Sequence, residues 1–261
     1  MSTATAIAIP MRPITTNRTS SDPSIRGTSN VARFRTRCAT CNLRELCLPC
    51  GLQAGEMCRL DDVVYTRKRV KRGETLYRSG EAFESLYAVR SGFFKSCVVL
   101  EDGRDQVTGF HMAGEIVGMD GIGNDRHAAD VVALEDSEVC VIPYARLEEA
   151  GLQRQLHKVM SRELVRDQGV MMLLGTMHAE ERLAAFLLNL SQRFVARGYS
   201  PNEFHLRMTR DEIGSYLGLS LETVSRLFSR FQTDGHISVQ QKHIRILDVK
   251  GLRAVMVREQ N

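Results

Sequence analysis

The chain has 261 residues, enough for one large domain or two small ones with a sizeable core. Its formal net charge is +4, but residues 1–37 hold six arginines and one aspartate, so the rest of the chain sums to about −1. The chain contains no run of about 18 apolar residues, so no membrane span is predicted. Seven cysteines without a secretory leader disfavour a disulfide framework. These features predict a cytoplasmic protein with reduced thiols.

Residues 1–37 predict a disordered basic tail. They are rich in Ser, Thr and Arg and contain three of the six prolines, so they cannot bury enough apolar surface to fold alone. The acid-poor composition is also typical of an organelle transit peptide, but the motifs further along the chain look bacterial. We therefore predict a disordered tail and not a transit peptide.

Residues 38–58 form a cysteine-rich segment. Cys38, Cys41 and Cys47 are spaced C-x2-C-x5-C, and the remote Cys140 stands in V-C-V-I-P. Three thiolates in ten residues plus one remote thiolate make a ligand set for an iron–sulfur cluster. Two alternatives stay open. Cys50 extends the run to a C-x2-C-x5-C-x2-C zinc knot with a short middle spacer, and thiol–disulfide sensing needs no metal. Cys140 alone is typical of a small buried strand residue.

Residues 59–146 read as short strands separated by glycine turns. This spacing predicts an all-β barrel or jelly roll, a β-roll sensor domain within an α+β chain. The strands are expected at residues 85–89, 93–100, 106–110 and 137–142.

Residues 147–178 predict a long dimerisation helix. Six positions spaced 4, 3, 4, 3 and 4 apart form one coiled-coil seam, in which Asp167 interrupts an apolar run. The seam positions are Met160, Leu164, Asp167, Met171, Leu174 and His178.

Residues 179–261 predict a winged helix-turn-helix DNA-binding domain. Thr209 can cap a first helix with Glu212 three residues on, Gly218 supplies a positive-φ turn, and Ser220 can cap the second helix. Residues 237–247 then look like a hairpin wing. The segment holds 12 basic and 9 acidic residues, so its specificity must come from placement more than from charge.

The second helix separates into a buried and a polar side. The inward face is expected to comprise Leu221, Val224, Leu227, Phe228 and Phe231. The polar side places an acceptor, a hydroxyl and guanidinium groups where a recognition helix meets base edges. The candidate DNA contacts are Glu222, Ser225, Arg226, Arg230 and the capping residue Thr209.

At this point the sequence resembles a known family. The resemblance covers about residues 38–250, and its motifs are the cysteine run through Leu48-Pro49 and residues 86–92, 108–118, 139–143, 179–186 and 222–226. These residues look like the fumarate-and-nitrate-reduction regulator (Fnr) branch of the Crp superfamily. The resemblance implies a β-roll, a long dimer helix and a winged helix-turn-helix.

The resemblance also implies a function. It implies oxygen-controlled transcription, mainly activation of anaerobic genes, through an oxygen-labile [4Fe–4S] cluster held by Cys38, Cys41, Cys47 and Cys140. A homodimer would bind a TTGAT-type inverted repeat in double-stranded DNA, with RNA polymerase as partner and a bacterial, nucleoid-associated location. Cys50 and Cys58 depart from the pattern as extra thiols near the cluster segment.

Neither cyclic-nucleotide binding nor catalysis is expected. Relatives that bind a cyclic nucleotide need a cation and a hydroxyl before an alanine, and here His127 and Ala128 stand there, which removes the charge-assisted bonds to phosphate. No G-x-S-x-G, Walker loop, H-E-x-x-H or G-x-G-x-x-G is present, so the chain is not expected to be an enzyme.

Asp167 and its seam neighbours Leu164 and Met171 suggest a switch between monomer and dimer, called here the dimer switch. In a parallel dimer the two copies of Asp167 would face each other and oppose association, and by resemblance the family has an acid at this place. A slightly rotated helix with Asp167 in solvent is the alternative.

Overall fold

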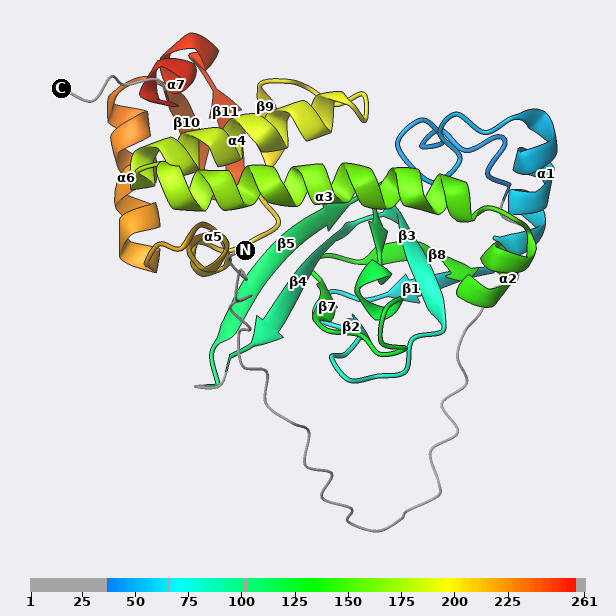
Figure 1. Cartoon of the computed structure of the whole chain (residues 1–261). Coiled ribbons are helices and arrows are strands. Elements are labelled where there is room, and N and C mark those ends of the chain that lie inside the picture. The colour runs from blue at the N-terminus through cyan, green and yellow to red at the C-terminus, as the bar shows by residue number, and fades with distance from the viewer. Residues whose placement is uncertain (1–36, 65, 101–102, 257–261) are drawn as a thin grey trace, which may run out of the picture.

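The computed structural model describes residues 37–64, 66–100 and 103–256. The tail predicted at residues 1–37 therefore lies almost entirely outside the described residues. The long helix α3 (Gln153–Thr176) crosses the molecule with the β-roll against it (Figure 1). The cysteine-rich segment lies near the beginning of α3 and the C-terminal domain lies near its end. This layout confirms the predicted α+β class.

The β-roll consists of two four-stranded antiparallel sheets, with strand orders β1-β8-β3-β6 and β2-β7-β4-β5. Alternating strand residues fill the space between them, with Phe94 and Val139 fully buried. The predicted strands are confirmed, with ends that differ by at most two residues. The strands are β1 (Thr66–Val70), β2 (Thr75–Tyr77), β3 (Ser85–Ser91), β4 (Phe93–Val99), β5 (Asp105–Met112), β6 (Ile116–Val117), β7 (Asp130–Ala133) and β8 (Ser137–Pro143). A short 3₁₀ turn, η1 (Met119–Gly121), follows β6.

Two short helices flank the β-roll. Helix α1 (Ala54–Val63) follows the cysteine turns and crosses the segment boundary expected at residue 58. Helix α2 (Tyr144–Glu149) follows β8. The long helix expected from residue 147 begins only at Gln153, because Gly151 takes φ +68° and breaks the chain between α2 and α3.

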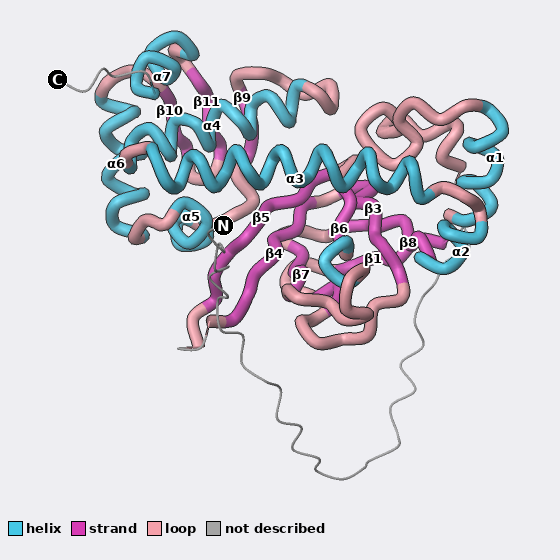
Figure 2. Tube along the Cα trace, viewed as in Figure 1, coloured by secondary structure: helices cyan, strands magenta, loops and turns pink. Residues whose placement is uncertain are grey.

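The C-terminal domain packs its helices against a small three-stranded sheet with the order β10-β11-β9 (Figure 2). Its core includes Leu183, Leu187, Ile213, Val224 and Phe231, each at most 1% exposed. The elements are α4 (Ala179–Val195), β9 (Glu203–His205), α5 (Arg210–Leu217), α6 (Leu221–Thr233), β10 (Ile237–Gln240), β11 (His243–Ile246) and α7 (Val249–Met256).

The helix-turn-helix has the predicted local chemistry. Thr209 and Glu212 form a capping box, Gly218 adopts φ +64°, and the Ser220 hydroxyl accepts from the Thr223 N–H. A Cβ on Gly214 would lie 2.6 Å from the Leu219 carbonyl oxygen, so the tight turn also requires a glycine on α5.

The buried face expected for the second helix is correct except at its first residue. Val224, Leu227, Phe228 and Phe231 are buried, but the prediction for Leu221 was wrong, because that side chain is 44% exposed. Leu221 lies on the same face of α6 as Val224 and Phe228, but it is the first residue of the helix, where the helix end is open to solvent. Among the described residues, every helix is too short or too polar to span a membrane.

Candidate functional site

Four cysteine side chains from two distant segments line one pocket. Cys38, Cys41 and Cys47 come from the turns before α1, and Cys140 comes from β8. Cys50 and Cys58 do not line this pocket, and Cys58 is exposed. The other lining residues are mostly apolar: Leu43, Arg44, Leu48, Pro49, Leu60, Val64, Ala88, Val89, Arg90 and Ile142.

The four thiols are close enough to influence one another's ionisation. Burial raises the pKa of Cys47 to about 12, and the neighbouring Cys140 and Cys41 also raise it. Burial also raises the pKa of Cys38, and the charges of Cys47, Asp61, Cys140 and Cys41 raise it further. Several thiolates in so small an apolar space therefore require a positively charged partner.

Arginine provides part of the positive charge at this pocket. The Arg90 Nη1 atom donates to the Cys41 Sγ atom at 3.6 Å. Burial raises the pKa of the Cys140 thiol, while the positive charges of Arg90 and Arg67 lower it. Arg90 also pairs with Glu138, at 3.6 Å, so the guanidinium is held in place. In the sequence Arg90 was part of the motif at residues 86–92, but no role beside the cysteines was predicted for it.

Two buried or half-buried polar side chains hold the cysteine turns. The Asp61 Oδ1 atom accepts from the backbone N–H of Cys38 at 2.5 Å and from that of Ala39 at 3.4 Å. The Gln155 amide on α3 is 3% exposed and donates to the carbonyl oxygens of Leu48 and Cys50, each at 2.6 Å. The cysteine segment is therefore bonded directly to the long helix. No sequence signal marked Gln155, which lies outside the seam.

The donor set fits an iron–sulfur core. All four candidate ligands are soft thiols in apolar surroundings, and the lining contains no carboxylate or imidazole. Within the described residues, no three His, Cys, Asp or Glu side chains converge on a common point as the ligands of one metal ion.

The polar face of α6 is open to solvent at its N-terminal half. Glu222, Ser225 and Arg226 are exposed there, and the Arg226 Nη2 atom donates to the Thr223 hydroxyl at 3.3 Å. Hydrogen bonds from its own backbone N–H and from the Ser220 hydroxyl lower the pKa of Glu222 and so favour its charged form. The face presents an acceptor, a hydroxyl and a cation, which suit base edges.

The other two candidate DNA contacts are engaged within the chain. The Thr209 hydroxyl accepts from the Glu212 N–H at 3.1 Å as part of the capping box. The Arg230 guanidinium pairs with Glu180 of α4 and, at 3.7 Å, with Asp234. Their contacts with DNA stay predictions.

The seam of α3 carries large apolar side chains exposed on this single chain. Leu164 is 59% exposed and Met171 63%, and Val165 and Met172 beside them are 65% and 68% exposed. Asp167 is exposed within the same stripe. A row of apolar side chains at coiled-coil spacing is typical of a helix that pairs with a second helix.

Residues 127–129 match the stretch that binds the cyclic-nucleotide phosphate in relatives, and here their polar groups are bonded within the chain. The Asp120 Oδ2 atom accepts from the N–H groups of Ala128, at 2.7 Å, and Ala129, at 3.2 Å. The Arg126 guanidinium donates to the Gly80 carbonyl oxygen at 2.7 Å, and the buried His127 ring stacks on Tyr77 with centroids 3.7 Å apart. A carboxylate thus occupies both backbone donors. The absence of a bound nucleotide stays a prediction.

Two domain families match the chain. Residues 67–153 match the cyclic nucleotide-binding domain, and residues 181–255 match the Crp-like helix-turn-helix domain.

Similar proteins are regulators of transcription. The transcriptional regulatory protein Btr of Bordetella pertussis is 48% identical over 85% of this chain and 94% of its own length. The fumarate and nitrate reduction regulatory protein of Escherichia coli is 46% identical over 80% of this chain and 86% of its own length. The solved structure of FixK2 from Bradyrhizobium japonicum has a TM-score of 0.68 at 30% identity, over 75% of this chain and 98% of that one.

Replacing Gln155 tests the link between the cysteine segment and α3. Gln155→Met keeps the side-chain length but leaves the Leu48 and Cys50 carbonyl groups without their donor. We expect the free energy of unfolding to fall by about 1–3 kcal/mol, measured by urea denaturation, with faster thiol labelling of the segment. Gln153→Met is the matched control, because Gln153 donates to one carbonyl group in an exposed region. Equal stability of the two variants would contradict this role.

Proposed function

Since this chain belongs to the Crp/Fnr family of transcription regulators, in its Fnr branch, we propose that it controls transcription in response to oxygen through a [4Fe–4S] cluster. The family binds DNA and forms dimers, and its members are regulators and not enzymes. The single observation that supports the cluster is the shared pocket of Cys38, Cys41, Cys47 and Cys140.

The four thiolates would hold the cluster, which when bound supplies an oxygen-sensitive redox centre. The protein contributes the apolar walls, the Arg90 charge beside Cys41, and the backbone bonds that fix the cysteine turns. Because Gln155 bonds the same turns to α3, a change in the cysteine segment reaches the dimer helix through a direct contact. A cluster site here is thereby suited to influence dimerisation.

DNA recognition is proposed for the exposed face of α6. Glu222, Ser225 and Arg226 would read a TTGAT-type half-site, and a dimer would bind an inverted repeat with half-sites one helical turn apart. RNA polymerase is the proposed protein partner of an activator in the bacterial cytoplasm, at the nucleoid. One chain reads one half-site, so loss of the dimer would remove most of the affinity.

Asp167 is the proposed control on dimerisation. It lies in the exposed stripe with Leu164 and Met171, so a parallel dimer would bring two carboxylates together between apolar side chains. Like charges in such a place oppose association unless other contacts offset them. The apoprotein would then stay near the monomer, and the cluster-bearing form would favour the dimer.

The choice of fourth ligand can be tested by paired substitutions. Cys140→Ser should abolish the visible absorbance of anaerobically purified protein, because Cys140 lines the pocket with the other three thiols. Cys50→Ser should retain it, because Cys50 lies outside that lining. The reverse result would move the fourth ligand to Cys50. Zinc in place of iron by elemental analysis would favour a zinc sensor instead, and protein without either metal would favour a thiol–disulfide sensor.

The dimer switch can be tested without the cluster. Asp167→Ala removes the repulsion from the stripe, so light scattering should give the mass of two chains in air and without iron. The same sample should shift a duplex with two half-sites. Leu164→Asp, which adds a second acid to the stripe, should stay monomeric even without air. An Asp167→Ala protein that remains a monomer would count against the switch.

A further inference from the structure

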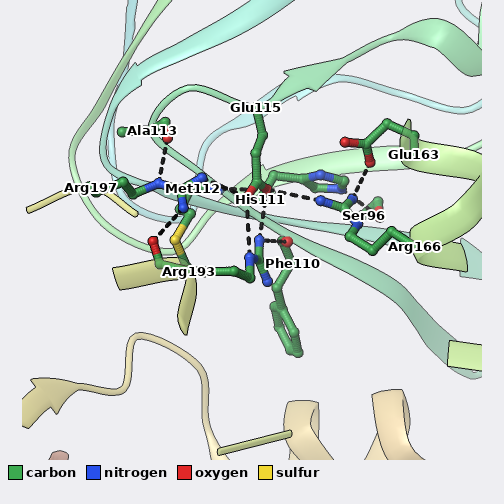
Figure 3. Close-up of polar contacts among 10 residues, drawn as sticks. All are labelled: Ser96, Phe110, His111, Met112, Ala113, Glu115, Glu163, Arg166, Arg193 and Arg197. Carbon is green, nitrogen blue, oxygen red and sulfur yellow. Dashed lines mark hydrogen bonds and ion pairs between the residues drawn. The ribbon is translucent and has the colours of Figure 1, made fainter. Parts of the chain in front are cut away.

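Three arginines, two on helices and one just after a helix, surround one carboxylate of the β-roll (Figure 3). Glu115 follows the turn after β5, and its oxygens lie 2.7 Å from Arg193 Nη2 and 2.7 Å from Arg197 Nη2. Arg193 is on α4 and Arg197 lies just beyond it, so both belong to the DNA-binding domain. Arg166 of the dimer helix α3 lies 3.3 Å from the same carboxylate. One side chain therefore contacts all three parts of the regulator.

These charges are withdrawn from solvent. The side chain of Arg197 is 5% exposed, that of Glu115 11% and that of Arg193 16%. The three arginines hold the pKa of Glu115 at about 2 despite its burial, so it is ionised at any physiological pH. Removing the acid would leave two buried guanidiniums unpaired beside each other, which is more costly than losing an exposed ion pair.

The arginines also bind the backbone of the turn that carries Glu115. Arg197 Nε donates to the Ala113 carbonyl oxygen at 2.5 Å, and Arg193 Nη2 donates to that of Phe110 at 2.7 Å. The turn also touches the cysteine segment, since a Cβ on Gly114, at φ +90°, would lie 2.9 Å from the Leu46 Cβ atom. The turn is therefore in contact with both the cysteine segment and the DNA-binding domain.

We infer that Glu115 is a positioning residue that fixes the orientation of the DNA-binding domain on the β-roll, and so sets the spacing between the two recognition helices of a dimer. A dimer binds two half-sites only if its recognition helices stand at the matching separation and angle. The angle is set in part by the two-residue connection at Met177 and His178, by Arg182 at the end of α3, and by the pair of Lys95 on β4 with Glu212 on α5 at 2.8 Å. The Glu115 cluster adds a fixed point that also includes the dimer helix α3. The inference rests on dimeric DNA binding and is independent of the cluster.

The test compares duplexes that differ in half-site spacing. Full-length Glu115→Gln protein, purified without air, is titrated by fluorescence anisotropy against the inverted repeat, the same repeat with one inserted base pair, and a single half-site. The insertion rotates one half-site by about 35°. In the wild type it should weaken binding strongly. In the variant that penalty should shrink at least about fivefold, while single half-site affinity stays within about twofold.

Glu135→Gln is the matched control. Glu135 pairs with Arg207 at 2.7 Å, also between the β-roll and the DNA-binding domain, but both side chains are about one-third or more exposed. This variant should keep the wild-type spacing penalty. If Glu115→Gln does not fold, the double variant Glu115→Gln/Arg197→Gln removes opposite charges together and should show the same relaxed spacing.

Two outcomes would overturn the inference. One is a Glu115 variant that discriminates against the inserted base pair as strongly as the wild type does. The other is a variant whose single half-site binding weakens as much as its two-site binding, because Glu115 would then support only the folding of the domain. Iron and light-scattering mass are recorded on the same samples. A wild-type protein that is colourless but has the mass of two chains would therefore count against the cluster proposal while leaving the comparison of spacings intact.

Discussion

The cysteine turns are held from two sides, and this constraint connects the candidate cluster pocket to the rest of the molecule. On one side, Cys38, Cys41 and Cys47 face Cys140 of β8 across an apolar pocket. On the other, the carbonyl groups of Leu48 and Cys50 accept both amide hydrogen bonds of the buried Gln155 at the beginning of α3. A change that loosens the pocket therefore also removes a support of the long helix.

The long helix relates this pocket to the DNA-binding face. Its first turns pack against the cysteine segment through Leu156 and Val159, its middle carries the exposed stripe with Asp167, and its end leads directly to α4. The Arg182 guanidinium binds that end by donating to the carbonyl oxygens of Leu174 and Met177 and to that of Leu217 on α5. The Glu115 cluster joins the same parts through the β-roll. The Arg182 contacts and the Glu115 cluster both depend on arginine, whose planar guanidinium group bonds several acceptors at once.

The features that could be predicted from the sequence are those fixed by local chemistry. The capping box of Thr209, the left-handed Gly218 and the main β-roll strands depend on neighbouring residues, and the structure has each of them. The features that were missed depend on tertiary neighbours. Nothing near Gln155 or Glu115 in the sequence indicates that one bonds a distant loop and the other meets three arginines. Leu221 was misplaced because a helical pattern does not show where its first turn meets solvent.

The central claim is that the shared pocket of thiols carries an oxygen-sensitive cluster on which DNA binding depends. Iron and acid-labile sulfide should be assayed in protein purified without air, together with its affinity for the inverted repeat, before and after exposure to air. The account predicts about four iron and four sulfide per chain, and the loss of both, and of tight DNA binding, in air. A protein without sulfide that binds the duplex equally well in both conditions would contradict it.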